Sequence, residues 1–171
     1  MIVDCSSTAR KCGCGQYGCA EVYSSAKNTA VRMQEADKRH KDIERSEPAN
    51  DAIHGDENET IATGVDLSAQ YVFERYLQND PLAIKVIEDT ADYLSVLAIN
   101  ICRVVDPEVI IFSGGLAKAG DVFIELIRSK MKSRTWTVLP TDVQLVIARS
   151  IDNGGMVGAA LAAKKLVNLC R

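Results

Sequence analysis

The most regular pattern of apolar positions lies between residues 80 and 106 and predicts one long helix. Asp80 followed by Pro81 is typical of a helix start, because the carboxylate caps the first turn and proline fits its first position. Asp106 and Pro107 predict the end. Apolar residues at intervals of three and four form one continuous face, which must be buried: Ala83, Val86, Ile87, Ala91, Leu94, Leu97, Ile101 and Val105.

Strand-like and helical segments alternate after this helix. The apolar run Val109–Phe112 has strand length and is expected to be a buried strand that ends at Ser113-Gly114-Gly115. A helix is expected over 121–132, a strand over 143–148 and a last helix over 156–169. This order predicts the fold class α/β.

The segment before the long helix is mostly helical. Helical patterns run from about Cys19, with a break near Ser24 and Ser25, and from a cap at Asp66 or Ser68 to Gln78. The residues between them, 42–63, are rich in acids and poor in large apolar side chains, and they predict an exposed acidic loop. Residues 2–4 could end a strand. We expect a single domain over 1–171.

Composition narrows the classes of function. The chain has 171 residues, 47% of them apolar and 25% charged, which is typical of a globular protein. Its net charge of −3 offers no basic excess for phosphates, so nucleic acid is not an expected partner. Because no signal-peptide pattern and no apolar run of about 20 residues occurs, no membrane partner is expected and the expected location is cytoplasmic.

The cysteines supply the candidate chemistry. Cys12, Cys14 and Cys19 stand within eight residues, separated by glycines that let the backbone turn sharply, and this spacing favours one tetrahedral zinc ion. Buried packing cysteines or a redox switch are the alternatives. For the fourth ligand, Cys5 is a candidate, a residue before Met1 is the remaining option, and His40 and His54 are poorly placed. Single cysteines in apolar helical patterns, Cys102 and Cys170, predict buried packing residues.

The decapeptide C-G-C-G-Q-Y-G-C-A-E, from Cys12 to Glu21, resembles the zinc motif of the ROK family of sugar kinases and repressors. All six fixed positions of C-x-C-G-x-x-G-C-x-E match. Three further segments follow in the order and rough spacing of the C-terminal half of those proteins: N-D-P-L-A from Asn79, V-D-P-E-V-I-I-F-S-G-G-L-A from Val105, and V-G-A-A from Val157. The resemblance covers nearly the whole chain.

This resemblance implies the C-terminal lobe of an actin-like ATPase (ribonuclease H-like) sugar kinase fold with a zinc-binding loop over 1–21. The metal ligands would be Cys12, Cys14 and Cys19, and Glu21 would accept hydrogen bonds from a hexose or N-acetylhexosamine. Ser113, Gly114 and Gly115 would contact the adenosine of ATP. A complete enzyme, of the glucokinase or N-acetylmannosamine kinase type, would also use Mg²⁺, and a homodimer is the family expectation.

Several family features have no match here. The histidine that serves as fourth zinc ligand, the aspartate base of the G-N-D motif and the main phosphate loop would all fall before Met1, and Asn79-Asp80 lacks the flanking pattern of the base. The chain by itself is therefore expected to show little or no kinase activity. Two alternatives stay open, a non-catalytic sugar-sensing module and a thiol redox protein. The sequence upstream of Met1 would separate them.

Overall fold

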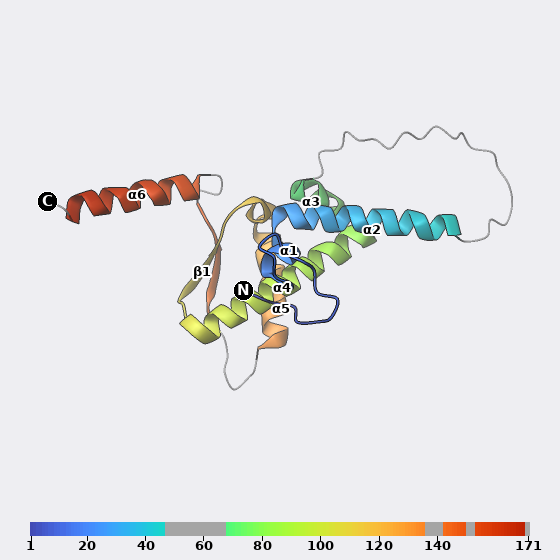
Figure 1. Ribbon diagram of the computed structural model, residues 1–171, viewed down its shortest axis with the longest axis horizontal. Helices are drawn as coiled ribbons and strands as arrows, with labels where there is room; N and C mark the ends of the chain where they lie inside the picture. The colour runs from blue at the N-terminus through green and yellow to red at the C-terminus, as the bar shows by residue number, and fades with distance from the viewer. Residues whose placement is uncertain (47–67, 136–141, 150–152, 170–171) are drawn as a thin grey trace.

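The computed structural model describes residues 1–46, 68–135, 142–149 and 153–169 (Figure 1). An N-terminal loop leads into helices α1 and α2, and helices α3 and α4 follow. Strands β1 and β2 enclose a 3₁₀ helix, η1, and helix α5, and helix α6 comes last. Their bounds are α1 Ala20–Ser24, α2 Ala26–Ser46, α3 Ala69–Leu77, α4 Pro81–Val105, β1 Val109–Phe112, η1 Gly115–Ala119, α5 Asp121–Arg134, β2 Gln144–Ile147 and α6 Gly154–Leu169.

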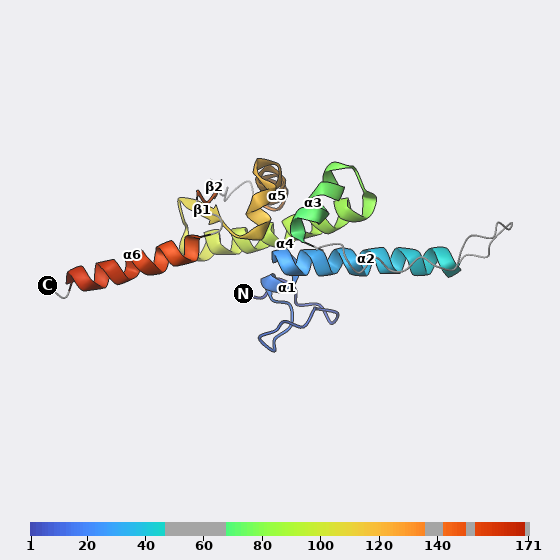
Figure 2. The ribbon, with the colours of Figure 1, turned by 90° about the horizontal axis from the view of Figure 1, so that it is seen from above.

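Helix α4 is the central element, as its apolar face predicts. Figure 2 shows α1, α2 and the N-terminal loop on one side of α4, and α3, α5 and the strands on the other. The core around it includes its own Ile87 and the fully buried Met33, Val72 and Ile127 of α2, α3 and α5. Phe73 of α3 meets Phe123 of α5 edge to face, with ring centroids 5.0 Å apart. One core therefore joins α2, α3, α4, η1, α5 and the two strands.

The starts of α3 and α4 are those that the sequence predicts. One carboxylate oxygen of Asp80 accepts hydrogen bonds from the backbone N–H groups of Leu82, at 2.8 Å, and Ala83, at 3.4 Å. Ser68 caps α3 by accepting from the N–H of Tyr71 at 3.3 Å. Asp106 ends α4 in a left-handed conformation, with φ of 50°. Local capping chemistry thus defines both ends of α4.

The two strands pair in parallel, and Ile111 lies opposite Val146. The expectation that Val109–Phe112 is a buried strand is wrong for one of its faces. Ile110 and Phe112 pack against the core, whereas Val109 is 40% exposed and Ile111 is 61% exposed. Helix α5 packs against the sheet on the core side. No described element covers the outer side.

Several element boundaries also differ from the sequence expectation: α5 ends at Arg134, two residues later than expected, and β2 is one residue shorter at each end. Helix α2 continues to Ser46, so residues 42–46 are helical and not part of an exposed loop. This stretch holds good helix formers, and no breaker occurs before Pro48. Helix α6 begins at Gly154, two residues earlier than expected. The rest of the predicted acidic loop, with His54, lies outside the described residues, as does Cys170, whereas Cys102 is buried as expected.

An ion-pair network joins three helices. The Arg75 guanidinium donates to both carboxylate oxygens of Asp37, at 2.7 and 2.9 Å, and to Asp80 at 2.5 Å. Burial acts to raise the pKa of Asp80, but Arg75 and the two capping N–H groups outweigh it and hold that pKa below its ordinary value. The side chain of Arg75 therefore connects α2 and α3 to the first turn of α4.

Replacing Arg75 with methionine is expected to destabilise the fold by about 2 kcal/mol at pH 7, because it leaves two partly buried carboxylates without their cation. The pKa of Asp80 is lowered in the folded state, so its ionised carboxylate stabilises the fold. This contribution to the free energy of unfolding is complete at pH values above the pKa of aspartate in the unfolded chain, about 3.9. It is lost as pH falls through the folded value, so the difference between variant and parent narrows in acid. Urea denaturation at several pH values measures this. Arg128→Met, which breaks a pair with the exposed Glu125 and a long hydrogen bond, 3.4 Å, to the Leu145 carbonyl, is the control and should cost less than about 1 kcal/mol.

Candidate functional site

The N-terminal loop folds back on itself twice before α1. Isolated antiparallel bridges join Ile2 to Cys19 and Lys11 to Tyr17. Between the second pair lies a tight turn, in which the N–H of Cys12 donates to the carbonyl of Gln16 at 2.7 Å and the N–H of Gly15 donates to the carbonyl of Cys12 at 3.0 Å. This turn brings Cys14 back toward the start of α1. Cysteines separated in sequence thus meet.

Glycine is required at two of the three positions in this loop. Gly15 has φ of +90° and Gly18 has φ of +76°, a region that other residues adopt at a cost. A Cβ on Gly18 would also lie 1.8 Å from the carbonyl oxygen of Asp4. Gly13 has no positive φ, and a Cβ there would meet nothing within 4 Å. The sharp turns therefore depend on Gly15 and Gly18.

The loop gathers the three predicted thiols into one group. The Sγ atoms of Cys12, Cys14 and Cys19 all lie within 4.8 Å of one another, and those of Cys14 and Cys19 are 3.6 Å apart. Tetrahedral zinc with sulfur ligands at 2.3 Å requires an Sγ–Sγ separation of about 3.8 Å. Cys12 and Cys19 are buried, while Cys14 is exposed. The cluster therefore has the composition of a zinc–thiolate centre, and the separation of Cys14 and Cys19 is close to the tetrahedral value.

The candidate fourth ligands are not part of this cluster. In the described part of the chain, neither Cys5 nor His40 belongs to the close group of metal-ligand atoms, and both side chains are exposed. Glu21 lies at the edge of the group, where its Oε2 accepts a hydrogen bond from the Cys12 thiol at 3.5 Å. The described residues thus supply three thiols with one carboxylate beside them.

The protonation of the thiols depends on their neighbours. A hydrogen bond from the backbone of Gln16, together with those of Cys12 and Cys19, lowers the pKa of Cys14. Hydrogen bonding to Cys14 and burial raise the pKa of Cys19 to about 11. A zinc ion requires thiolates, so its binding to this cluster would release protons.

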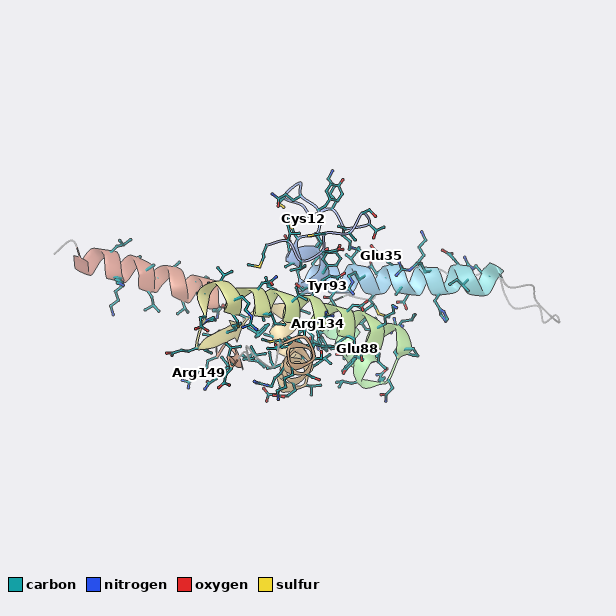
Figure 3. All side chains as sticks on the ribbon, turned by 90° about the horizontal axis from the view of Figure 1, so that it is seen from below. Cys12, Glu35, Glu88, Tyr93, Arg134 and Arg149 are labelled. Carbon is teal, nitrogen blue, oxygen red and sulfur yellow. The ribbon has the colours of Figure 1, made fainter. Side chains whose placement is uncertain are left out.

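A set of contacts that sequence patterns do not reveal attaches the loop to the helices. The hydroxyl of Tyr23 donates to Asp4 at 2.6 Å and accepts from the N–H of Arg10 at 2.7 Å, and its ring stacks on Tyr93 of α4 with centroids 4.0 Å apart. Arg10 forms two hydrogen bonds, at 2.9 and 2.6 Å, with Glu35 of α2. Figure 3 shows Cys12 in the loop, with Tyr93 and Glu35 on the neighbouring helices. The thiol cluster therefore stands on a small core of its own, beside α4.

The Ser113-Gly114-Gly115 turn follows β1 as predicted, and each glycine has a structural explanation. Gly114 has φ of +86°, with nothing within 4 Å of where a Cβ would lie. A Cβ on Gly115 would lie 2.8 Å from the Cβ of Ala26, the first residue of α2. Glycine at 115 thus lets η1 approach α2 closely. This contact brings the turn next to the α1–α2 junction, five residues after Glu21.

A cavity of about 360 Å³ adjoins this turn, between α3 and the η1–α5 segment. Polar side chains and apolar side chains both face it, which is usual for a small-molecule site. Its lining includes Gln70, Phe73, Glu74, Tyr76, Gly115 and Lys118. The α3 residues of this lining occur in an ordinary amphipathic helix, so the sequence gives no sign of them.

The family model described as the ROK family matches residues 2–166. The chain belongs to the ROK family. It is 27% identical to a glucokinase of Halalkalibacterium halodurans over 157 residues, which are 92% of this chain and 44% of that protein. It is 30% identical to an N-acetyl-D-glucosamine kinase of Escherichia coli O6:H1 over 151 residues, 88% of this chain and 41% of that protein. It therefore spans less than half the length of these relatives.

A solved structure shows the same fold. The ROK family glucokinase of Streptomyces griseus, in complex with glucose and AMPPNP, superimposes with a TM-score of 0.69 at 21% identity, over 96% of this chain and 50% of that one. The α/β kinase fold expected from the sequence is thus confirmed. Among the described residues, no helix combines the length and hydropathy that crossing a membrane requires.

Proposed function

We propose that this chain is the C-terminal lobe of an ATP-dependent hexose kinase of the glucokinase or N-acetylglucosamine kinase type, and that it supplies one side of the sugar and nucleotide cleft. Its relatives carry those two names. The observation that carries the proposal is the position of Glu21. Its carboxylate contacts the Cys12 thiol, and it lies five residues before Ala26, which the Ser113-Gly114-Gly115 turn approaches closely. One lobe over 1–171 would thus present a sugar-side carboxylate and a nucleotide-side turn.

Cys12, Cys14 and Cys19 would hold a structural zinc ion. Zinc there would fix the loop by tying its turn, residues 12–16, to Cys19 at the start of α1, and its chemistry would be structural because the ion only anchors thiolates. The buried positions of Cys12 and Cys19 support this role. A ligand from outside the described residues would complete the tetrahedron.

Glu21 would accept hydrogen bonds from sugar hydroxyls. In the thiol state its carboxylate accepts from Cys12 at 3.5 Å, but a metal-bound thiolate has no proton to donate and carries the same negative charge. Zinc binding would therefore release the exposed carboxylate for another donor. Vicinal sugar hydroxyls are suitable, because charge-assisted hydrogen bonds of this kind contribute roughly 1.5 to 3 kcal/mol each.

Ser113, Gly114 and Gly115 would contact the adenosine of ATP. The open space above Gly114 allows a flat base to approach the backbone, and the adjoining cavity has the volume for a nucleoside. Phosphoryl transfer in kinases also requires Mg²⁺ and a residue that accepts the hydroxyl proton. No described residue stands out for that second role, so we expect this chain alone to phosphorylate sugars very slowly.

The replacement Glu21→Gln tests the sugar site. It keeps size and helix propensity but removes the charge, so it is expected to raise the dissociation constant for glucose or N-acetylglucosamine about tenfold, equivalent to roughly 1.4 kcal/mol. Chemical-shift titration of the zinc-loaded chain with each sugar measures this, even at millimolar affinity. Titration with an ATP analogue should give the same affinity as the parent chain.

A matched control is Glu125→Gln, which neutralises an exposed acid on α5. Sugar affinity should not change in that variant. Equal affinity in Glu21→Gln and the parent chain would show that Glu21 has no role in sugar binding, and its effect would then be limited to the charge interaction at the start of α1.

A further inference from the structure

Cys14 differs from the other two members of the thiol cluster in its access to solvent. Cys12 and Cys19 are buried, whereas Cys14 is exposed. Its neighbours on both sides are glycines, and a Cβ on either Gly13 or Gly15 would meet nothing within 4 Å. Figure 2 shows the N-terminal loop projecting from the helices. The described atoms therefore leave open space on both sides of Cys14, through which a small molecule can reach its sulfur.

Cys14 also has a second thiol close enough to react with it. Its Sγ atom lies 3.6 Å from the Sγ atom of Cys19, and a disulfide requires about 2.05 Å. Cys19 is held at the start of α1 by its bridge to Ile2, so a small movement of the exposed turn would bring the two sulfurs to bonding distance. An exposed cysteine beside a second cysteine is the arrangement found in thiols that sense oxidants.

We propose that Cys14 is an oxidation site, at which a hydroperoxide converts Cys14 and Cys19 to a disulfide and thereby displaces the zinc ion of the proposed metal site. A zinc ligand is a thiolate, which is the form of cysteine that reacts with peroxides. With two of its three thiolates joined to each other, only Cys12 of the cluster would remain as a ligand. The metal would therefore leave.

The chemistry has two steps. The Cys14 thiolate attacks one peroxide oxygen, the O–O bond breaks, and the other oxygen leaves with a proton from solvent as an alcohol, or as water when hydrogen peroxide is the oxidant. The sulfur is oxidised to a sulfenic acid and the peroxide is reduced. The sulfur of Cys19 then attacks that of Cys14, the S–S bond forms, the S–O bond breaks, and hydroxide leaves and takes up a proton to become water.

The disulfide would act on Glu21 and not on the fold as a whole. It keeps the turn attached to the start of α1, which is the connection that the metal otherwise provides. Cys12, released from the metal, would bind a proton again and donate to Glu21, as it does at 3.5 Å in the thiol state. Glu21 would then bind sugar hydroxyls less well, a consequence that rests on the sugar role proposed above.

The test treats the zinc-loaded chain with hydrogen peroxide in the presence of a chromogenic zinc chelator. Zinc is expected to leave in step with disulfide formation, about one ion per disulfide, and peptide mass mapping should place the disulfide between Cys14 and Cys19. Dithiothreitol with added zinc should restore the starting zinc content. The oxidised chain should bind glucose or N-acetylglucosamine at least about threefold more weakly than the untreated chain.

Cys5 is the internal reference, because it is exposed in the same loop but is not part of the close group of thiols. The proposal is overturned if Cys5 is oxidised before Cys14, if the disulfide joins Cys12 to Cys14, or if zinc stays bound after Cys5 has reacted. Sugar affinity that is equal before and after disulfide formation would overturn the link to Glu21.

Two variants separate the steps. Cys5→Ser should release zinc as the parent chain does. In Cys19→Ser, which lacks the second sulfur, Cys14 should stop at the sulfenic acid and react with dimedone, whereas mapping of the parent chain tests the disulfide without any variant. An untreated chain that holds no zinc would contradict the metal site alone, because the disulfide between Cys14 and Cys19 can still form and be mapped in it.

Discussion

Replacing Cys12 with serine is expected to abolish stoichiometric zinc binding and to destabilise the N-terminal loop by about 3 to 5 kcal/mol, since loss of a metal site is among the largest single-residue effects. Cys12 is 4% exposed and belongs to the small core of the loop, with Cys19, Val22 and Tyr23. Its loss would therefore release the turn from α1. Elemental analysis should find one zinc per parent chain, and chemical denaturation of both proteins gives the stability difference.

Cys5→Ser is the matched control for this experiment. Cys5 lies in the same loop, is exposed and is not part of the close group of thiols. The zinc content and the stability of the Cys5→Ser variant should therefore equal those of the parent chain. A parent chain that folds normally with less than about a tenth of an equivalent of zinc would contradict the metal site. If it then carried a disulfide between Cys14 and Cys19, the redox alternative would replace it.

The predictions that held depend on short stretches of sequence. Asp80, Pro81 and Asp106 determine the ends of α4 through bonds to near neighbours, so the sequence predicts those ends. The thiol cluster is predictable for the same reason, because its three members lie within eight residues and the glycines between them shape the turn. Contacts between residues that are near in sequence can therefore be predicted without a structure.

The features that the sequence could not predict depend on residues far apart in the chain. The stacking of Tyr23 on Tyr93, the pairing of Arg10 with Glu35 and the approach of Gly115 to Ala26 each join segments that no short pattern connects. The exposure of Ile111 is a similar case. An apolar run predicts a strand, but whether its second face is covered depends on what packs there.

The approach of Gly115 to Ala26 also gives the candidate site its organisation. The two proposed binding regions, Glu21 with the thiols and the turn at Gly114, belong to segments about 90 residues apart, by sequence numbering. The close approach of Gly115 to Ala26 joins the turn to the start of α2, directly after α1, and α3 packs on both α2 and η1. The loop that holds Glu21 and the turn at Gly114 are therefore connected through the start of α2.

Gly18→Ala is expected to be the most damaging glycine substitution in the loop, at about 3 to 5 kcal/mol. The left-handed conformation alone costs a non-glycine residue roughly 1 to 2 kcal/mol. The new Cβ would in addition lie 1.8 Å from the Asp4 carbonyl oxygen, so the two backbone segments must separate. That would break the hydrogen bond from the N–H of Val3 to the Gly18 carbonyl, now 2.8 Å, and move Cys19 away from the other thiols. Zinc affinity should fall with stability.

Two neighbouring glycines turn this into a graded series, measured by urea denaturation and zinc content. Gly15→Ala has the unfavourable φ of +90° but no atom within 4 Å of its Cβ, so it should cost about 1 to 2 kcal/mol. Gly13→Ala has neither problem and should change stability by less than about 1 kcal/mol, because alanine there only restricts the unfolded chain. A Gly18→Ala protein as stable as Gly15→Ala would mean that the Asp4 carbonyl moves aside at no cost, and that the pairing of Ile2 with Cys19 does not hold the thiol cluster together.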